Sequence, residues 1–420
     1  MKVKIGVIAL AVLLSNCEKV VDEIEVVGNN QISNKEFVET SNKEGVWECG
    51  TGSGGTTTHL GTQKYFESVI FQEGTNGYHS YRIPSIVKTN TGTLIAFCEG
   101  RKNSRHDYGD VDVVYRRSTD HGVTWGPLTM LFSKHGDTCG NPTAVVDAIT
   151  GGIWIFMSYQ DEFHAQFEIL PNYQAIDDWG ERRVYSNVSY DDGLTWGDLQ
   201  NRTSQLLPSN YTWDAMGPGT GIQLKYGAVD GRLVIPAIGR NIISDDNGAT
   251  WDYQLITPGT SEGTITELCN GDLVRNDRAS LSVLKDRKRR QISVSSNDGL
   301  DWTEWESNNT LLDPLCEASI MRYNDSYPPR LIFINPATTL GGLENRKKMR
   351  ARISYDDGET WPISRELDAV NGGYSSLVKT GDYNIGSLQE LRQNGGNSFS
   401  IIFRKFNLSW ILDGTIEPVN

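Results

Sequence analysis

Short segments that alternate apolar and polar residues recur along the chain. Residues 110–117 (DVDVVYRR) and 347–354 (KKMRARIS) alternate in part with a period of two, which is typical of half-buried β-strands. Long stretches with the period of an amphipathic helix are hard to find. The pattern therefore predicts an all-β fold built from many short strands.

A motif of eight residues occurs in five copies, four of which have Asp, Gly and Trp at fixed offsets, while the copy at Ser295 has Asn297 and Asp301 substituted. The copies are STDHGVTW at Ser118, SYDDGLTW at Ser189, SDDNGATW at Ser244, SSNDGLDW at Ser295 and SYDDGETW at Ser354. Their starts lie about 50 to 70 residues apart, which is too irregular for a solenoid but suits propeller blades with unequal loops.

Each copy has the chemistry of a hairpin turn. The Asp side chain can accept backbone N–H groups further along the turn, and Gly tolerates a positive φ. The hydroxyl residue adds a hydrogen-bonded brace and the Trp an apolar plug. We therefore expect a strand, a turn and a second strand around every copy.

Composition narrows the choice of partners. The 420 residues include 43 Gly, and 39 Lys and Arg stand against 53 Asp and Glu, a net charge of −14. This balance argues against nucleic acid or an anionic membrane as the main partner. An anionic substrate would need a local concentration of arginine.

The first residues, MKVKIGVIALAVLLSNC, have the lysines and the short apolar run of an export signal. LLSNC resembles a bacterial lipobox, in which Cys17 would be lipidated after cleavage, while ordinary cleavage and secretion is the alternative. We expect export to the periplasm, the cell surface or the medium. The predicted organisation is a signal at 1–17, a tether at 18–60 and a β-rich domain at 61–420.

The five remaining cysteines show neither a CxxC pair nor a His at metal-ligand spacing. No metal site is expected from them. An exported chain can form disulfides, but an odd number of cysteines leaves at least one thiol unpaired.

A charged residue in an apolar strand needs a reason to be there. Arg82 is such a residue, because it stands in YRIPSIVKT at 81–89. An isolated cation in this setting requires an anion.

YRIP resembles the FRIP-type motif, and the five turns resemble the Asp boxes, of the sialidase (neuraminidase) superfamily. Further matches to bacterial exo-sialidases follow in the same order: EGR at 99–101, HDYGDVDVVYRRSTD at 106–120, GNPTAVVD at 140–147, GPGTGIQL at 217–224, LVRNDR at 273–278 and GGYSSL at 372–377. The resemblance implies a six-bladed antiparallel β-propeller.

The resemblance also implies three arginines that clamp the carboxylate of sialic acid, since guanidinium groups bind carboxylates in a bidentate manner. Arg82, Arg278 and Arg346 match these positions. Arg350 and Arg352 are alternatives to Arg346, because a slightly different alignment would select them.

The same resemblance assigns the groups that react. Tyr374 in GGYSSL matches the nucleophile and Glu262 in SEGTITEL its base, a pairing that avoids repulsion between two carboxylates. Glu267 is the competitor of Glu262, but odd spacing along a strand places it on the opposite face.

Asp107 matches the general acid, with Asp110 and Asp112 as competitors whose alternating context favours a role in a strand. Arg101 and Asn141 match positions that contact substituents of the sugar. The mechanism that these matches imply needs no cofactor.

These matches imply a retaining exo-α-sialidase that acts on sialylated glycans. A trans-sialidase or an enzyme that releases an anhydro sugar would share the same site. A non-catalytic glycan-binding propeller and a hydrolase of neutral glycans are alternatives from other classes.

Lipidation predicts that processing of the chain in a bacterial host is sensitive to globomycin and that the mature protein fractionates with membranes. Both properties should be lost in Cys17→Ser, which lacks the thiol to be acylated. Release of soluble mature protein by the wild type and by Cys17→Ser alike would contradict lipidation.

Overall fold

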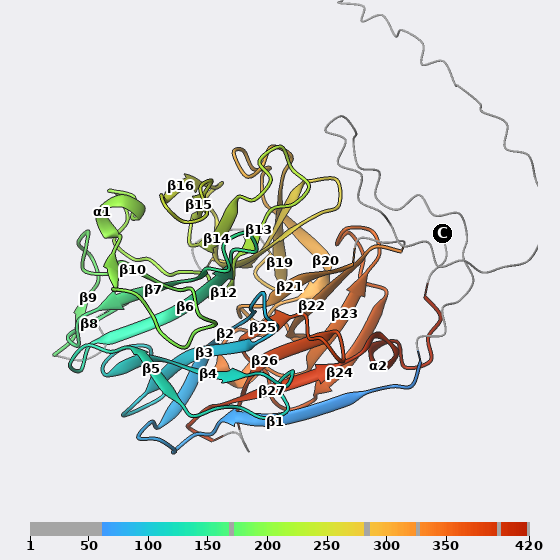
Figure 1. Ribbon diagram of the computed structural model, residues 1–420, viewed down its shortest axis with the longest axis horizontal. Helices are drawn as coiled ribbons and strands as arrows, with labels where there is room; N and C mark the ends of the chain where they lie inside the picture. Colours follow the sequence, from blue (N-terminus) through green and yellow to red (C-terminus); the bar gives the residue numbers. More distant parts are fainter. Residues whose placement is uncertain (1–60, 168–171, 281–285, 325–327, 393–395, 418–420) are drawn as a thin grey trace, which may run out of the picture. The chain divides into compact units, whose positions relative to one another are not determined.

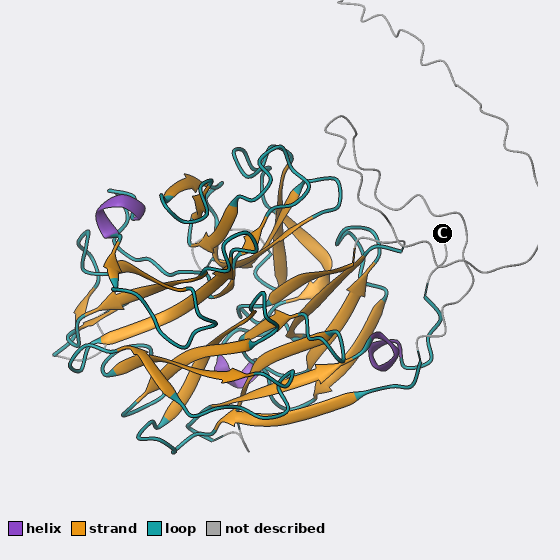
Figure 2. Ribbon diagram, in the orientation of Figure 1, coloured by secondary structure: helices purple, strands orange, loops and turns teal. Residues whose placement is uncertain are grey.

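The computed structural model describes residues 61–167, 172–280, 286–324, 328–392 and 396–417 (Figure 1). The predicted signal and tether, with Cys17, lie outside these residues. Strands dominate the described chain, and its helices are α1 (Thr203–Leu206), α2 (Leu408–Leu412) and the 3-10 helix η1 (Leu343–Asn345) (Figure 2). No described helix has the length and apolar character that crossing a membrane requires. The prediction of an all-β fold is confirmed.

Four sheets have four antiparallel strands each. In pairing order they are β1 (Tyr65–Phe71), β27 (Ser400–Phe406), β26 (Ile385–Leu391), β25 (Ser375–Val378); β13 (Ile222–Gln223), β14 (Leu233–Ala237), β15 (Arg240–Ser244), β16 (Asp252–Leu255); β17 (Thr260–Glu267), β18 (Leu273–Ala279), β19 (Arg289–Ser295), β20 (Glu306–Leu312); and β21 (Ser319–Asn324), β22 (Arg330–Pro336), β23 (Met349–Ser354), β24 (Ile363–Asp368).

One larger sheet has nine strands. Its path is β11 (Gln200–Asn201), β10 (Arg183–Ser189), β7 (Ile153–Gln160), β6 (Thr138–Val146), β4 (Val111–Ser118), β3 (Leu94–Arg101) and β2 (Ser80–Lys88), with β12 (Gly219–Thr220) on β6 and β5 (Thr129–Phe132) on β4. A small separate sheet pairs β8 (His164–Ala165) with β9 (Gln174–Ala175).

The predicted blade number is wrong, because the described residues form four four-stranded blades instead of six. The other long strands merge into the nine-stranded sheet, since β4 pairs with β6 in parallel at Val111 and Thr138, and β12 also joins β6 in parallel. The turn motifs mark where the chain reverses between two strands, but they do not specify which other strands form hydrogen bonds with each hairpin.

The five turn motifs form the braces that their sequences predict. In the first copy the Ser118 hydroxyl donates to Asp120 Oδ1 (2.8 Å), and the Thr124 amide and hydroxyl both donate to the same carboxylate at 2.9 and 2.6 Å. In the second copy, hydrogen bonds from the Thr195 side chain and backbone lower the pKa of Asp191 to about 2. The braces are local, so each motif specifies its own turn.

Tryptophans of the motifs fill the spaces between sheets. Trp125 packs edge-on against Phe403 of β27, with ring centroids 5.4 Å apart, and Trp251 packs on Phe156 of β7 at 4.7 Å. Gly122 has a positive φ and lies against Phe403, where an added Cβ would come within 2.2 Å of the ring. The motif glycine therefore permits both the turn and the close packing.

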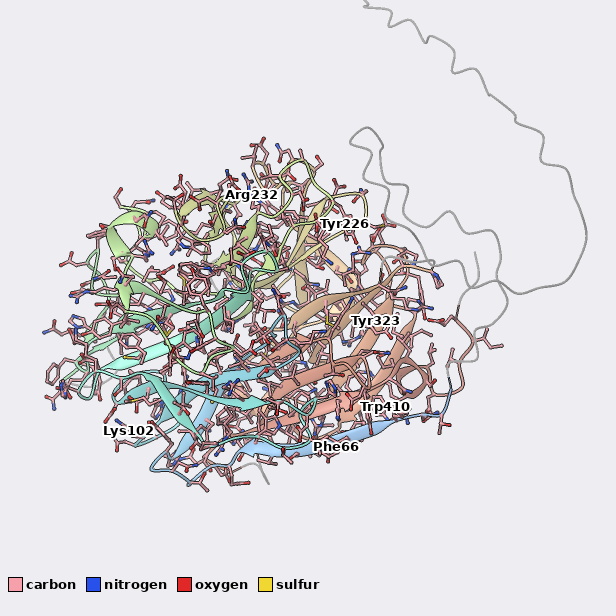
Figure 3. The ribbon with its side chains drawn as sticks, viewed as in Figure 1. Phe66, Lys102, Tyr226, Arg232, Tyr323 and Trp410 are labelled. Carbon is pink, nitrogen blue, oxygen red and sulfur yellow. The ribbon has the colours of Figure 1, made fainter. Side chains whose placement is uncertain are left out.

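The first and last strands of the described chain pair with each other. β1 runs antiparallel to β27, with Tyr65 opposite Phe406. Tyr65 and Phe406 also contact Trp410 of α2, labelled in Figure 3, at centroid distances of 4.8 and 5.0 Å. This pairing covers an edge that would otherwise expose unpaired backbone groups.

The cysteines of the described residues include unpaired thiols, as the odd number of cysteines predicts. Cys98, Cys139 and Cys316 are free and buried, whereas Cys269 is disulfide-bonded. Burial raises the pKa of the Cys98 thiol, which keeps it protonated and inert.

Candidate active site

A cavity of about 320 Å³ opens where several strands begin. The beginnings of β2, β6 and β17 contribute to its wall, together with the loop after β3 and the residue before β25. All eight site residues predicted from the sequence line this cavity: Arg82, Arg101, Asp107, Asn141, Glu262, Arg278, Arg346 and Tyr374.

Tyr374, Glu262 and Arg278 form a hydrogen-bonded group. The Tyr374 hydroxyl donates to Glu262 Oε1, while Arg278 Nη1 donates to the Tyr374 hydroxyl (3.1 Å) and to Glu262 Oε2 (2.5 Å). The Tyr374 phenol and the Glu262 carboxylate are thus in direct contact. This is the arrangement that an activated nucleophile requires.

The electrostatic environment keeps the Tyr374 phenol neutral. Burial and the negative charge of Glu262 raise its pKa well above the usual value, against the opposing effects of Arg278 and Arg346. Since the phenolate is disfavoured, the oxygen can attack only as its proton leaves for an adjacent base. Glu262 is within reach of that proton.

Glu390 of β26 holds Arg82 in place, and the sequence reasoning missed it. It accepts Arg82 Nε at 3.0 Å and Nη2 at 3.1 Å, and its side chain has no exposed surface. It also accepts the backbone N–H groups of Ile83 (3.1 Å) and Tyr374 (3.2 Å). A charged residue within the buried strand IGSLQEL carries the same signal that identified Arg82.

Two further arginines complete a cationic wall near Tyr374. The guanidinium carbons of Arg82 and Arg346 lie 5.6 and 5.1 Å from the Tyr374 ring centroid. The Nε atoms of Arg278 and Arg346 are buried and have no hydrogen-bond partner. The positive charge of these arginines at the cavity wall favours an anionic ligand.

The two alternatives to Arg346 lie elsewhere. Arg350 donates to Ser364 of the neighbouring strand β24, and Arg352 donates to Asn335 (2.7 Å). Neither lines the cavity. The structure therefore places Arg346, and not its neighbours, beside Tyr374.

Asp107 lies on the loop between β3 and β4. Its side chain is accessible from the cavity, but the surrounding protein still removes water from the carboxylate, which by itself would raise the pKa of Asp107. The positive charges of Arg101 and Arg82 outweigh this desolvation, so the pKa of Asp107 is lowered. The competitors Asp110 and Asp112 instead bind Lys102, at 2.8 and 3.2 Å, outside the cavity.

A second polar network lines the other side of the cavity. Arg101 donates two hydrogen bonds to Glu99 Oε2, at 2.8 and 2.5 Å, and the backbone N–H of Asn141 donates to Glu99 Oε1 at 2.8 Å. The Asn141 side chain accepts Arg182 Nη2 (2.6 Å), and Arg182 stacks over Trp213 at 4.3 Å. Glu99, Arg182 and Trp213 line the cavity as well, and the sequence reasoning did not select them.

Glu317 supports the chain next to Tyr374. Its Oε2 accepts the Ser375 amide at 2.8 Å, its Oε1 has no hydrogen-bond partner, and burial raises its pKa well above the usual value. In the sequence, a carboxyl group between the small residues Cys316 and Ala318 indicates a buried charge. Only the fold shows that Glu317 accepts a hydrogen bond from Ser375.

Glu267 does not line this cavity, as its odd spacing from Glu262 suggested. It lies at the far end of β17, where its carboxylate accepts the amides of Lys225 and Tyr226, both at 2.8 Å. The competition between the two glutamates is settled by position, because a strand of this length separates them by roughly 16 Å.

One group of carboxylates in the described chain has the spacing of metal ligands: Asp177, Asp178 and Glu181, with oxygens within 4.8 Å of one another. It lies outside the cavity. Glu181 already accepts two backbone amides and contacts His164. In the cavity itself, six arginines stand against the carboxylates of Glu99, Asp107 and Glu262, so positive charge prevails among its lining residues.

Comparison with known proteins identifies the class. Residues 92–388 match the family model of the BNR repeat-like domain. The chain is 39% identical to the exo-alpha-sialidase of Aspergillus fumigatus and 41% identical to that of Arthroderma benhamiae, each over 366 residues, 80% of this chain and 86% of the relative. The protein belongs to the sialidase family.

Solved structures agree in fold. The Hadza microbial sialidase Hz136 has a TM-score of 0.68 and 27% identity, over 81% of this chain and 68% of that one. The leech intramolecular trans-sialidase has a TM-score of 0.67 and 18% identity, over 82% of this chain and 70% of that one.

Removing the partner of Arg82 should destabilise the fold. Glu390→Gln would leave a buried guanidinium uncompensated, and we expect a loss of about 3 kcal/mol in the free energy of unfolding, measured by urea denaturation. Glu344→Gln, which removes the exposed carboxylate that pairs with Arg392, is the control and should lower the free energy of unfolding much less than Glu390→Gln does. Equal losses in the two variants would contradict a special role for Glu390.

Proposed function

We propose that the protein is a retaining exo-α-sialidase that hydrolyses terminal α-linked sialic acids on glycoproteins, glycolipids or oligosaccharides. The observation that carries the proposal is the contact of Tyr374 with Glu262 and Arg278 inside a cavity lined by arginines. Relatives named exo-alpha-sialidases, at 39% and 41% identity, support it. We assign the activity to the domain at 61–420.

Substrate binding depends on the carboxylate that sialic acid carries at its anomeric carbon. Arg82, Arg278 and Arg346 would bind it through their guanidinium groups, which line the cavity. Glu390 orients Arg82 in advance, which reduces the entropy lost on binding. Asn141 and Arg101 would contact the substituents of the sugar.

In the first chemical step the Tyr374 oxygen forms a bond to the anomeric carbon, and its proton passes to Glu262. The glycosidic bond breaks, and Asp107 donates a proton to the departing oxygen. A neutral phenol avoids the repulsion that a carboxylate nucleophile would meet from the substrate carboxylate.

In the second step water attacks the same carbon. Asp107 takes a proton from the water, the bond to Tyr374 breaks, and Glu262 returns the proton to the phenol oxygen. Two inversions give net retention of configuration. Transfer to another sugar or formation of an anhydro sugar would use the same intermediate, so NMR of the products from a fluorogenic sialoside distinguishes hydrolysis from both.

We also propose that the protein is exported, on the basis of the N-terminal sequence, and that Cys17 anchors it to a membrane. This location would bring the enzyme to sialylated glycans outside the cytoplasm.

The Tyr374 assignment predicts a covalent intermediate. A 3-fluorosialyl fluoride should trap a glycosyl-enzyme with the added mass on the peptide that contains GGYSSL, since the fluorine slows breakdown through the oxocarbenium-like transition state. Tyr374→Phe should lose the adduct and lower kcat roughly 100-fold or more, while sialoside binding is largely retained. Tyr190→Phe, at an exposed tyrosine, is the matched control. An adduct on another residue, or none despite rapid hydrolysis, would refute the assignment.

The Asp107 assignment predicts a shift between two pH profiles. In the free enzyme Arg101 and Arg82 lower the pKa of Asp107, so the carboxyl group ionises already at low pH. A bound substrate carboxylate would neutralise part of that positive charge and raise the pKa of Asp107. The alkaline limb of kcat should therefore lie at higher pH than that of kcat/KM. Asp107→Asn should abolish this limb. Coincident limbs would contradict the role.

A further inference from the structure

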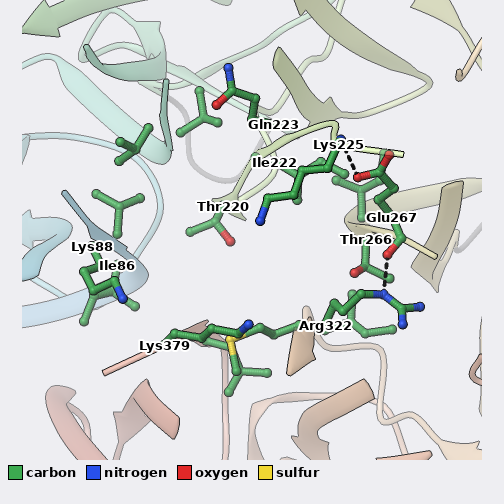
Figure 4. Close-up of a pocket in the computed structure, with 18 of the residues that line it drawn as sticks. Ile86, Lys88, Thr220, Ile222, Gln223, Lys225, Thr266, Glu267, Arg322 and Lys379 are labelled. Atoms are coloured by element: carbon green, nitrogen blue, oxygen red, sulfur yellow. Dashed lines mark hydrogen bonds between the residues drawn. The ribbon is translucent and has the colours of Figure 1, made fainter. Parts of the chain in front are cut away.

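A second cavity lies at the opposite ends of the strands that build the catalytic cavity. It has a volume of about 310 Å³, and we call it the distal cavity, bounded by Lys88, Ile222, Lys225, Glu267, Arg322 and Lys379 (Figure 4). β2 contributes Arg82 to the catalytic cavity and Lys88 to the distal one, and β17 contributes Glu262 and Glu267 in the same way. Five or six residues of strand separate the two, roughly 16 to 20 Å.

Positive charge surrounds the distal cavity although the whole chain has a net charge of −14. Figure 4 shows Lys88, Lys225 and Lys379 on different sides of the open space. Lys88 and Lys225 are exposed and form no ion pair with any residue of the described ranges. Arg322 differs, because Asp357 binds it at 2.9 Å.

The one carboxylate at this cavity is already occupied. Glu267 is 7% exposed and accepts the amides of Lys225, Tyr226 and Gly227 at 2.8, 2.8 and 3.2 Å. Its oxygens accept hydrogen bonds from backbone donors, and no ion pair within the described ranges occupies the ammonium groups of Lys88 and Lys225. The balance of charge at the opening favours an anion.

The rest of the wall is apolar. Val146, Ile222 and Met321 are half-buried and line the cavity beside the lysines. A cavity of this volume is large enough for a small organic molecule and exceeds the needs of an inorganic ion. Cationic rim and apolar wall together suit a ligand that has a charged head and an apolar body.

We propose that the distal cavity is a second binding site that takes a small organic anion, with its carboxylate or sulfonate at the cationic rim formed by Lys88 and Lys225 and its apolar body against Ile222 and Met321. The site is separate from the catalytic cavity and does not depend on the proposed hydrolase activity. The proposal also gives Glu267 a structural role, because this residue forms part of the wall of the distal cavity, at the other end of β17 from Glu262.

Titration calorimetry with 2-naphthoate tests the proposal, with 2-naphthamide as the neutral match and inorganic phosphate as an anion without an apolar body. We expect one-to-one binding of naphthoate, weakened by added NaCl and about 10-fold tighter than binding of either match. Lys88→Gln combined with Lys225→Gln should weaken naphthoate about 10-fold and leave the KM for a sialoside unchanged. Lys64→Gln combined with Lys288→Gln, at exposed lysines elsewhere, should change neither.

Arg278→Gln separates the two cavities, because Arg278 lines only the catalytic one. Naphthoate affinity should persist in this variant. Loss of binding there, with no effect of the Lys88 and Lys225 substitutions, would show that the probe occupies the catalytic arginines and would overturn the proposal. Two other results would overturn the proposal as well: no detectable binding at about 10 mM naphthoate, a concentration that would reveal even a millimolar dissociation constant, or equal affinity for naphthoate and the amide. Thermal unfolding of each variant confirms that it is folded.

Discussion

The carboxylate of Glu390 is buried, and four donors from two distant parts of the chain converge on it. It binds the guanidinium of Arg82 twice and accepts the amides of Ile83 and Tyr374. A single charged group thus connects β2, β26 and the residue that would act as nucleophile. Because a buried charge without its partner is strongly unfavourable, the position of the cationic wall and that of Tyr374 are coupled. The rest of the catalytic cavity is arranged around this pair.

The surroundings shift the pKa values of Tyr374 and Asp107 in opposite directions. Burial and Glu262 raise the pKa of Tyr374, whereas Arg101 and Arg82 lower that of Asp107 despite desolvation. These shifts favour a neutral Tyr374 and an ionised Asp107. A bound carboxylate would change the balance at Asp107, so that substrate charge itself prepares the acid. This couples recognition to chemistry through electrostatics, with no movement of the chain required.

The inner strands serve two ends of the fold. Glu262 and Glu267 belong to one strand, yet one contacts Tyr374 while the other accepts three backbone amides at the distal cavity. The same strand therefore supports chemistry at one end and a cationic, apolar recess at the other. Strands long enough to pack between neighbouring sheets necessarily expose two ends, and each end can acquire its own charges.

The sequence by itself determined the local features: the strand periodicity, the five braced turns and the motif residues that later share one cavity. Each turn is specified within eight residues, as Ser118, Asp120 and Thr124 illustrate, so no distant partner is needed. Only the tertiary structure decided the lateral pairing of β4 with β6, which overturned the expected blade number, and the partner of Arg82, 308 positions away. These contacts join segments whose separation along the chain leaves no periodic signal, because burial and pairing across sheets depend on the whole fold.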